Sequence, residues 1–115
     1  MEKRIEISIL LDFYGELLTE KQRDIMILYY NDDLSLAEIS EITNTTRQAI
    51  HDINKRCYNL LINYEDKLKL MEKNMVMLKT KENLLCKLEE LKKYVDSSSN
   101  FYRVDEIKND ITENI

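Results

Sequence analysis

The chain has 115 residues and a net charge of −5, and it contains one glycine and no proline. Because residues that interrupt helices or form hairpin turns are almost missing, the composition predicts an all-α fold. The length allows one compact domain with an appendage. Net acidity argues against a protein that coats nucleic acid, so any contact with nucleic acid must be made locally by a few side chains.

The N-terminal segment and the two cysteines indicate where the protein works. Polar residues interrupt the apolar stretch near the N-terminus, which makes it a poor signal peptide. No apolar run approaches the roughly 20 residues needed to cross a bilayer. Cys57 and Cys86 lie far apart and lack the spacing of metal or redox sites. We therefore expect a soluble, cytoplasmic protein without membrane contact, whose cysteines are buried thiols in a reducing cytosol.

Two helices are predicted ahead of the central part of the chain. The first covers about 3–14, because apolar residues recur there at helical spacing, and Gly15 suits its C-terminal end. The second begins after Thr19, because Thr19 and Gln22 have the spacing of a capping box. The residues expected to face the core are Ile5, Ile9, Leu10 and Phe13 in the first helix and Ile25, Leu28 and Tyr29 in the second.

The segment 35–58 contains the parts of a helix-turn-helix. Ser35 and Glu38 form a second capping box and predict a short helix that ends near Thr43. A tight turn of about three residues follows, and Thr46 is placed to cap the next helix. The apolar side of the short helix is expected to consist of Leu36, Ile39 and Ile42.

The helix that begins at Arg47 separates into two faces when it is projected at about 100° per residue. The apolar face consists of Ala49, Ile50, Ile53, Cys57, Leu60 and Leu61. The polar face consists of Arg47, Gln48, His51, Asp52, Lys55 and Asn59, with Asn54 and Arg56 at the borders. An ordinary solvated face would have the same pattern, but the capped helix and turn that precede it favour a recognition helix.

Several side chains of this helix are suited to nucleic acid. The residue that caps the helix start and the neighbouring amides can meet a phosphate, the first-turn side chains can reach base edges, and the later basic side chains can meet the flanking backbone. The candidate nucleic-acid-binding residues are therefore Thr46, Arg47, Gln48, His51, Lys55 and Arg56. Asp52 lies on the same face and would repel phosphates, and His51 could equally be an ordinary surface side chain.

Beyond the helix-turn-helix, apolar residues continue at alternating steps of three and four, which is the spacing of a coiled-coil seam. The seam and predicted homodimer contact consists of Leu61, Tyr64, Leu68, Met71, Met75 and Leu78. We expect a helical domain at 1–60, a long helical extension for assembly at 61–95, and a linker with a short, weak helix at 96–115. One or two helices can cover 47–94.

Groups that carry out catalysis are missing from the sequence. It has one histidine, no glycine-rich phosphate loop, no cluster of cysteine and histidine, and no nucleophile with a matching base. We expect a binding protein that is not an enzyme and that has no cofactor, no metal site and no small-molecule substrate.

A set of short blocks resembles one known family. The blocks are Leu18–Arg23, Leu28–Tyr30, Asp33–Ile39, Arg47–Ala49, Lys55–Arg56 and Tyr64–Leu68. In this order they resemble the YlxM family of bacterial helix-turn-helix proteins over roughly residues 5–90. The resemblance implies a helix-turn-helix domain of the sigma region-four type, followed by long C-terminal helices. It also implies a link to the signal recognition particle, because the genes of that family tend to neighbour those for its components.

Two functional hypotheses follow. The first is a regulatory DNA-binding protein that takes part in the signal recognition particle pathway, and the basic and amide side chains at the recognition helix start favour it. The alternative is a protein- or RNA-binding accessory factor of the signal recognition particle, which keeps the helix-turn-helix only as a scaffold. Net acidity and Asp52 favour the alternative.

Overall fold

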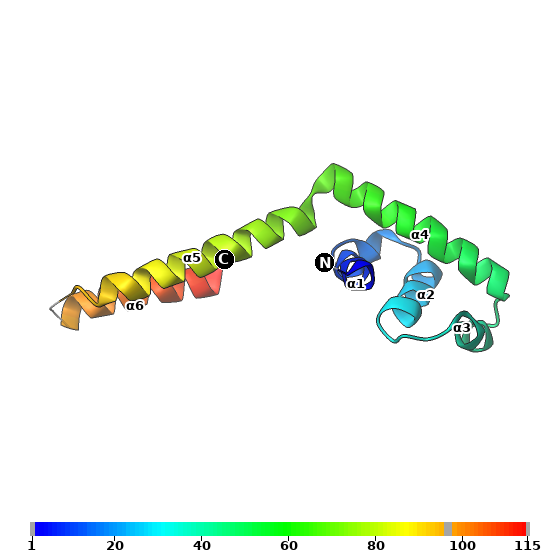
Figure 1. Ribbon diagram of the computed structural model, residues 1–115, viewed down its shortest axis with the longest axis horizontal. Helices are drawn as coiled ribbons and strands as arrows, with labels where there is room; N and C mark the ends of the chain where they lie inside the picture. The colour runs from blue at the N-terminus through cyan, green and yellow to red at the C-terminus, as the bar shows by residue number, and fades with distance from the viewer. Residues whose placement is uncertain (1, 96–97, 115) are drawn as a thin grey trace. The chain divides into compact units, whose positions relative to one another are not determined.

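The computed structural model describes residues 2–95 and 98–114. Its elements in chain order are α1 (Lys3–Tyr14), the 3-10 helix η1 (Gly15–Leu17), α2 (Glu20–Tyr30), α3 (Leu36–Thr43), α4 (Arg47–Leu68), α5 (Leu70–Lys92) and α6 (Ser98–Asn114) (Figure 1). Every regular element in these ranges is a helix, which confirms the all-α prediction. The chain forms two compact units, Met1–Met71 and Glu72–Ile115, so the first unit extends beyond position 60.

The predicted starts of α2, α3 and α4 are confirmed, and a capping side chain fixes each of them. The Thr19 hydroxyl accepts the Gln22 amide N–H at 3.2 Å, and the Gln22 side-chain oxygen accepts the Thr19 amide N–H at 3.0 Å. Such reciprocal bonds satisfy amides that lack partners within the helix. The end of α1 differs slightly from the prediction, because Gly15 keeps right-handed helical angles and the chain continues as η1.

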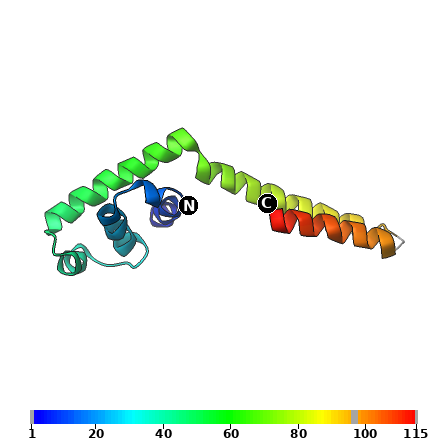
Figure 2. The ribbon, with the colours of Figure 1, turned by 180° about the vertical axis from the view of Figure 1, so that it is seen from behind.

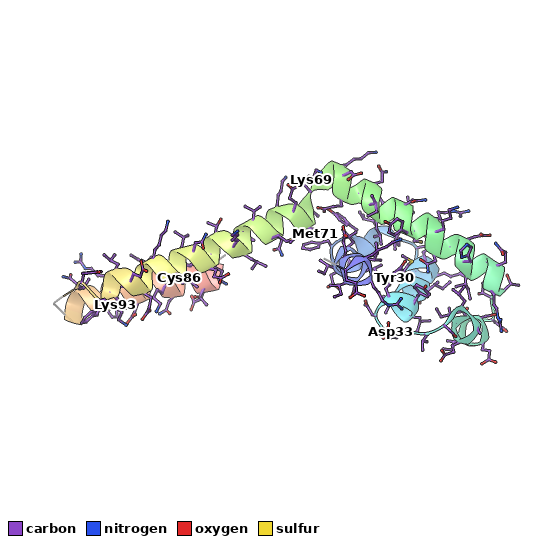
Figure 3. The ribbon with its side chains drawn as sticks, in the orientation of Figure 1. Tyr30, Asp33, Lys69, Met71, Cys86 and Lys93 are labelled. Atoms are coloured by element: carbon purple, nitrogen blue, oxygen red, sulfur yellow. The ribbon has the colours of Figure 1, made fainter. Side chains whose placement is uncertain are left out.

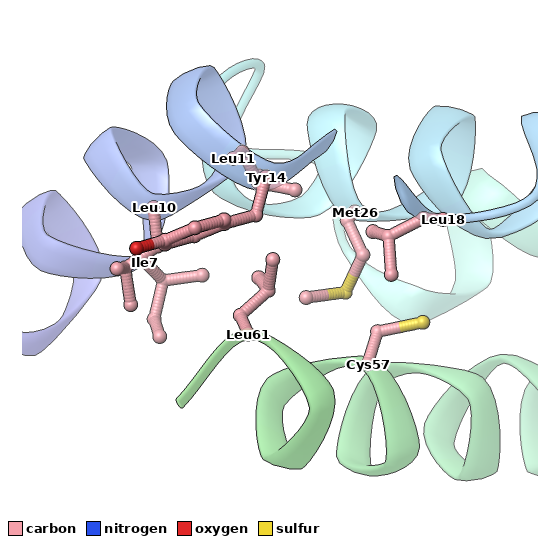
Figure 4. Packing of buried hydrophobic residues seen from close by; sticks show 8 residues of the cluster. All are labelled: Ile7, Leu10, Leu11, Tyr14, Leu18, Met26, Cys57 and Leu61. Atoms are coloured by element: carbon pink, nitrogen blue, oxygen red, sulfur yellow. The ribbon is translucent and has the colours of Figure 1, made fainter. Parts of the chain in front are cut away.

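The larger core of the first unit lies between α1, α2 and α4 (Figure 4). Its buried members are Ile7, Leu10, Leu11, Tyr14, Leu18, Met26, Cys57 and Leu61. The face predicted for α1 was only partly right, because Leu10 is buried whereas Ile5 is 52 % exposed. The buried face of α1 follows steps of three, one and three from Ile7 to Tyr14, and this stripe of four residues is continuous along the helix.

A smaller core attaches α3 to the rest of the first unit. Ile25, Ile39 and Ile50 are fully buried against one another, one each from α2, α3 and α4. Burying each such side chain stabilises the fold by roughly 1.5–3 kcal/mol. Leu28 and Tyr29 pack beside them as predicted, but Ile42 is 64 % exposed. The eight-residue α3 contacts only α2 and α4 appreciably, and these contacts do not cover Ile42.

The long helical region breaks at Lys69, which adopts left-handed angles with φ 58° between α4 and α5 (Figure 3). A buried tyrosine and a carboxylate hold the break in place. The Tyr14 hydroxyl donates to Glu65 Oε1 at 2.6 Å and accepts the Leu70 amide N–H at 3.0 Å. Glu65 Oε1 also accepts the Met71 amide N–H at 3.0 Å. These three bonds form what we call the Tyr14–Glu65 clamp.

The residues of the predicted seam differ in their surroundings on the two sides of the break. Leu61 is fully buried in the chain's own core, and Tyr64 and Met71 pack against that core. The exposed members of the predicted seam are Leu68, Met75 and Leu78, at 46 %, 48 % and 50 %. Half of the stripe therefore stabilises the first unit, because the Lys69 turn lets Met71 reach back to the core.

In the second unit α5 and α6 run antiparallel and side by side, as Figures 1 and 2 both show. Lys92 forms an ion pair with Asp105 at 3.0 Å, and Lys108 forms another with Glu89. Val104 is 5 % exposed, and it is the buried hydrophobic residue of the described part of this unit. None of the helices in the described ranges combines the length and apolar character required to cross a membrane.

The C-terminal segment differs from the predicted linker and short, weak helix. Helix α6 has 17 residues and starts at Ser98, so Ser98, Ser99 and Asn100 belong to the helix. The remaining predicted linker residues, Asp96 and Ser97, lie outside the described residues. The ion pairs with α5 and the burial of Val104 explain why this segment is a longer helix than its own sequence indicates.

Candidate nucleic-acid interface

The turn between α3 and α4 is fixed by side-chain hydrogen bonds. Asn44 ends α3 in the left-handed region at φ 56° and ψ 37°, a conformation that asparagine tolerates well. The Ser40 hydroxyl donates to the Thr45 carbonyl at 2.5 Å, and the Thr45 amide donates to the Ser40 carbonyl at 3.3 Å. The Thr45 hydroxyl also donates to the Thr43 carbonyl at 3.1 Å. The direction in which α4 leaves the turn is therefore well defined.

The start of α4 is capped as the sequence predicts. The Thr46 hydroxyl accepts the Ala49 amide N–H at 3.2 Å. The amides of Arg47 and Gln48 precede this bond in the first turn, where the helix dipole gives a partial positive charge. This end of α4 can bind a phosphate group through backbone N–H groups.

The two predicted faces of α4 are confirmed by burial. Ile50, Cys57 and Leu61 are buried, and Ala49, Ile53 and Leu60 are half-buried. The exposed candidate residues are Thr46, Arg47, Gln48, His51, Lys55 and Arg56. They occupy a little under three turns of one helix. Arg47, Gln48, His51 and Lys55 share one side of α4, whereas Arg56 lies at the border of that side.

The electrostatics of this face are mixed. Arg47, Lys55 and Arg56 supply three cationic side chains, against the carboxylate of Asp52. Gln48 Nε2 donates to Asp52 Oδ1 at 3.0 Å, so the glutamine lies along the helix with its carbonyl oxygen still able to accept. A base edge would have to compete with this bond for the Gln48 amide. The face is weakly basic on a protein that is acidic overall.

Sequence reasoning missed an aromatic hollow beside this face. The hollow has a volume of about 240 Å³ and is lined by Lys3, Tyr29, Tyr30, His51, Asn54, Lys55 and Tyr58. Two of these residues, His51 and Lys55, belong to the predicted face, and the others come from α1, the end of α2 and the flank of α4. Two features of the sequence could have indicated this hollow. They are the adjacent pair Tyr29–Tyr30 and the spacing of His51, Lys55 and Tyr58 on one helix.

Other chemistry is limited in the described part of the chain. No three side chains of histidine, cysteine, aspartate or glutamate are grouped there so that they could hold a metal ion. Cys57 is buried, and this burial raises the pKa of its thiol above the ordinary value. Cys86 is exposed on α5, contrary to the expectation that both thiols are buried.

Comparison with known proteins identifies the family. The family model UPF0122, described as "Putative helix-turn-helix protein, YlxM / p13 like", matches residues 1–101. A UPF0122 protein of Clostridium novyi (strain NT) is 53 % identical over 116 residues, which cover 100 % of both chains. A UPF0122 protein of Clostridium kluyveri is 54 % identical over 115 residues, again 100 % of both chains. A third, from Clostridium acetobutylicum, is 53 % identical over 111 residues and 96 % of each chain. The chain therefore belongs to the UPF0122 family of YlxM / p13 like helix-turn-helix proteins, as its sequence blocks predict.

Proposed function

We propose that this protein is a regulatory DNA-binding protein that reads duplex DNA with the first turns of α4. The observation that carries the proposal is the capped start of α4, where Arg47 and Gln48 are exposed directly after a rigid turn. In a helix-turn-helix, the N-terminal residues of the second helix contact base edges in the major groove. The family membership, with its helix-turn-helix description, supports the same reading.

Each candidate side chain has a distinct role in this proposal. The first-turn amides and Thr46 position one phosphate. Arg47 offers two N–H donors to the edge of a guanine, and Gln48 offers a donor and an acceptor to an adenine once it leaves Asp52. Lys55 and Arg56 lie about two turns further along α4 and neutralise phosphates of the flanking backbone.

The charge of the protein shapes the expected affinity. Few cations face the DNA, and Asp52 opposes them, so non-specific binding should be weak at physiological salt. Specificity should therefore depend on base contacts by Arg47 and Gln48 more than on overall attraction to phosphate.

We propose in addition that the protein acts in the signal recognition particle pathway, which the resemblance to YlxM implies.

A second function is favoured by one specific contact. The Gln48–Asp52 hydrogen bond engages a side chain that should read bases, and it places a carboxylate among the candidate residues. Both features suit a protein partner of the signal recognition particle, because a carboxylate on this face would repel the phosphates of RNA as it would those of DNA. In this alternative the protein is an accessory factor, and the helix-turn-helix serves as a scaffold.

We also propose that the protein assembles as a homodimer. Helix-turn-helix proteins commonly read two half-sites as dimers. Leu68, Met75 and Leu78 expose apolar side chains that a second chain could cover. This proposal retains the predicted assembly role for the exposed part of the seam only.

A fluorescence-anisotropy titration at two salt concentrations tests the DNA proposal. The ligands are duplex DNA from the region around the protein's own gene and, separately, signal recognition particle RNA. Arg47→Ala should relax base preference and cost roughly 1–3 kcal/mol, whereas Lys55→Ala should weaken binding to all sequences and lower the salt slope by about one. Lys21→Ala is the matched control, because Lys21 is exposed on α2 beside Glu20 and Asp24.

The outcome separates the two functions. DNA binding that depends on Arg47, and not on Lys21, supports the DNA-reading proposal. If duplex DNA binds no tighter than about 10⁻⁴ M, the weak limit of non-specific contact, the DNA proposal fails. Binding of the RNA alone would then favour the accessory factor.

A further inference from the structure

We propose that the aromatic hollow beside α4 is a binding site for one unpaired pyrimidine nucleotide of a single-stranded nucleic acid. The hollow has three tyrosine rings, from Tyr29, Tyr30 and Tyr58, and three basic or potentially basic side chains, from Lys3, His51 and Lys55. This site goes beyond duplex reading by the first turn of α4. It lies further along the helix and includes neither Arg47 nor Gln48.

The lining of the hollow suits an anion that carries a flat ring. No acidic residue lines it. Two other hollows of the first unit have acidic linings, from Glu2 and Asp33 in one and from Glu20 and Asp24 in the other. A fourth hollow, beside Arg56, also has no acidic residue, but it has no aromatic ring either. Tyrosine rings supply stacking surfaces, and lysines supply charge for the phosphate, which is the combination found in single-strand sites.

The rings are held in place before any ligand binds. The Tyr30 hydroxyl donates to Asn54 Oδ1 at 3.0 Å, and the rings of Tyr29 and Tyr30 meet edge to face at a centroid distance of 4.8 Å. The Arg4 guanidinium lies 4.8 Å from the centroid of the Tyr29 ring and is paired with Asp33 at 2.8 Å. Figure 3 labels Tyr30 and Asp33 at the end of α2 and in the loop after it. A preorganised site loses less conformational freedom on binding.

The cations are positioned at the same site. Lys3 Nζ lies over the Tyr58 ring, 4.5 Å from its centroid, in a cation–π contact. A base that stacks on this face must displace the exposed ammonium group, which then stays close enough to meet the phosphate. His51, Lys55 and Tyr58 follow one another at steps of four and three on α4 and share one side of that helix. A phosphate that enters the hollow can therefore meet Lys3 and Lys55 together.

The size and the polar groups of the hollow restrict the ligand. Its volume of about 240 Å³ is below the roughly 300–1,000 Å³ of sites for drug-sized ligands, so a single small ring is favoured over a larger group. Asn54 accepts a bond from Tyr30 through its oxygen, which leaves its side-chain nitrogen as a donor. Thymine and uracil carry carbonyl oxygens that can accept such a bond, and the small volume favours their single ring over the double ring of a purine.

The test uses the full chain and a short, fluorescently labelled oligothymidine, with oligouridine and an abasic oligomer of equal phosphate number beside it. Wild type should bind both pyrimidine oligomers and bind the abasic oligomer much more weakly. Tyr58→Leu should weaken binding roughly 5- to 150-fold, the fold-change that corresponds to loss of one stacked base. Lys3→Gln should lower the slope of log affinity against log salt by about 0.7, because one phosphate contact is lost.

Matched controls separate this site from the duplex-reading surface. Lys21→Gln removes an equal charge from an exposed position outside the hollow and should leave binding unchanged. Arg47→Ala should impair duplex reading and leave binding of the single strand intact, so either proposal can fail without the other. Preference for oligouridine or oligothymidine reports whether RNA or DNA supplies the nucleotide.

Three results would overturn the proposal. The first is equal binding of the abasic oligomer and oligothymidine, which would show that no base is held. The second is a Tyr58→Leu variant that melts like wild type and binds like wild type. The third applies even if that variant does not fold: ultraviolet crosslinking of wild type to oligothymidine should map to Tyr29, Tyr30 or Tyr58, and crosslinks confined to other residues would place the strand elsewhere.

Discussion

Removing one hydroxyl from the Tyr14–Glu65 clamp should destabilise the first unit measurably. Tyr14 is 1 % exposed, and Tyr14→Phe keeps the ring in the core while it deletes both bonds of the hydroxyl. The bond to the Glu65 carboxylate contributes about 1.5–3 kcal/mol, and the bond from the Leu70 amide contributes about 0.5–1.5 kcal/mol. Leu70 is exposed, so water can replace the tyrosine at its amide. We therefore expect a loss of about 2–3 kcal/mol.

Two measurements check this prediction. Urea unfolding followed by circular dichroism gives the change in the free energy of unfolding. Hydrogen exchange at the amides of Leu70 and Met71 reports on the clamp itself, and both amides should lose protection in Tyr14→Phe. Tyr102→Phe is the matched control, because Tyr102 is 70 % exposed on α6. If Tyr14→Phe changes neither stability nor exchange more than this control does, the clamp does not hold the break at Lys69.

Three further predictions concern the caps, assembly and alkaline pH. Ser35→Ala and Thr46→Ala should each cost about 0.5–2 kcal/mol in thermal unfolding, because each hydroxyl caps an amide; unchanged melting in both would contradict the capping argument. Leu68→Lys should weaken dimerisation by several kcal/mol, because it would bury a charge in the dimer contact. Ile5→Lys is the control and should not weaken dimerisation, because Ile5 is exposed outside the seam. Sedimentation that finds a well-folded wild-type monomer at micromolar concentration would disprove the homodimer. Burial and the Glu65 bond raise the pKa of Tyr14 above its ordinary 10.0. The contribution of the protonated hydroxyl to the free energy of unfolding is therefore complete below pH 10.0 and is lost as the pH rises through the raised pKa. Tyr14→Phe should lose less stability than wild type between neutral pH and pH 11, and an equal loss would contradict this assignment.

Helix starts were predictable because their determinants are local. At Thr19, Ser35 and Thr46 the capping hydroxyl and the amide that it binds lie three residues apart, so the sequence itself displays the contact. The break at Lys69 was not predictable in this way. Lysine rarely takes left-handed angles, and the clamp joins residues 51 positions apart in the sequence, Tyr14 and Glu65.

In the candidate interface, too, the features with local determinants were predictable and those that depend on tertiary packing were not. The exposed face of α4 follows from a single periodicity, so residues such as Arg47 and His51 were placed correctly on the surface. The aromatic hollow requires side chains from three helices, and only their tertiary packing brings Lys3 and Tyr29 to the flank of α4. Periodicity within one helix contains no information about such a meeting.

The two thiols of this protein differ in accessibility, so thiol labelling can report on opening of the core. Cys57 is fully buried in the core of the first unit and has a raised pKa, whereas Cys86 is exposed in the second unit. A thiol reagent should therefore modify Cys86 at once and Cys57 only during transient opening of the core, since the accessible thiolate is the reacting species. In Cys86→Ser protein, the rate of labelling then gives the free energy of that opening under native conditions, without any engineered probe.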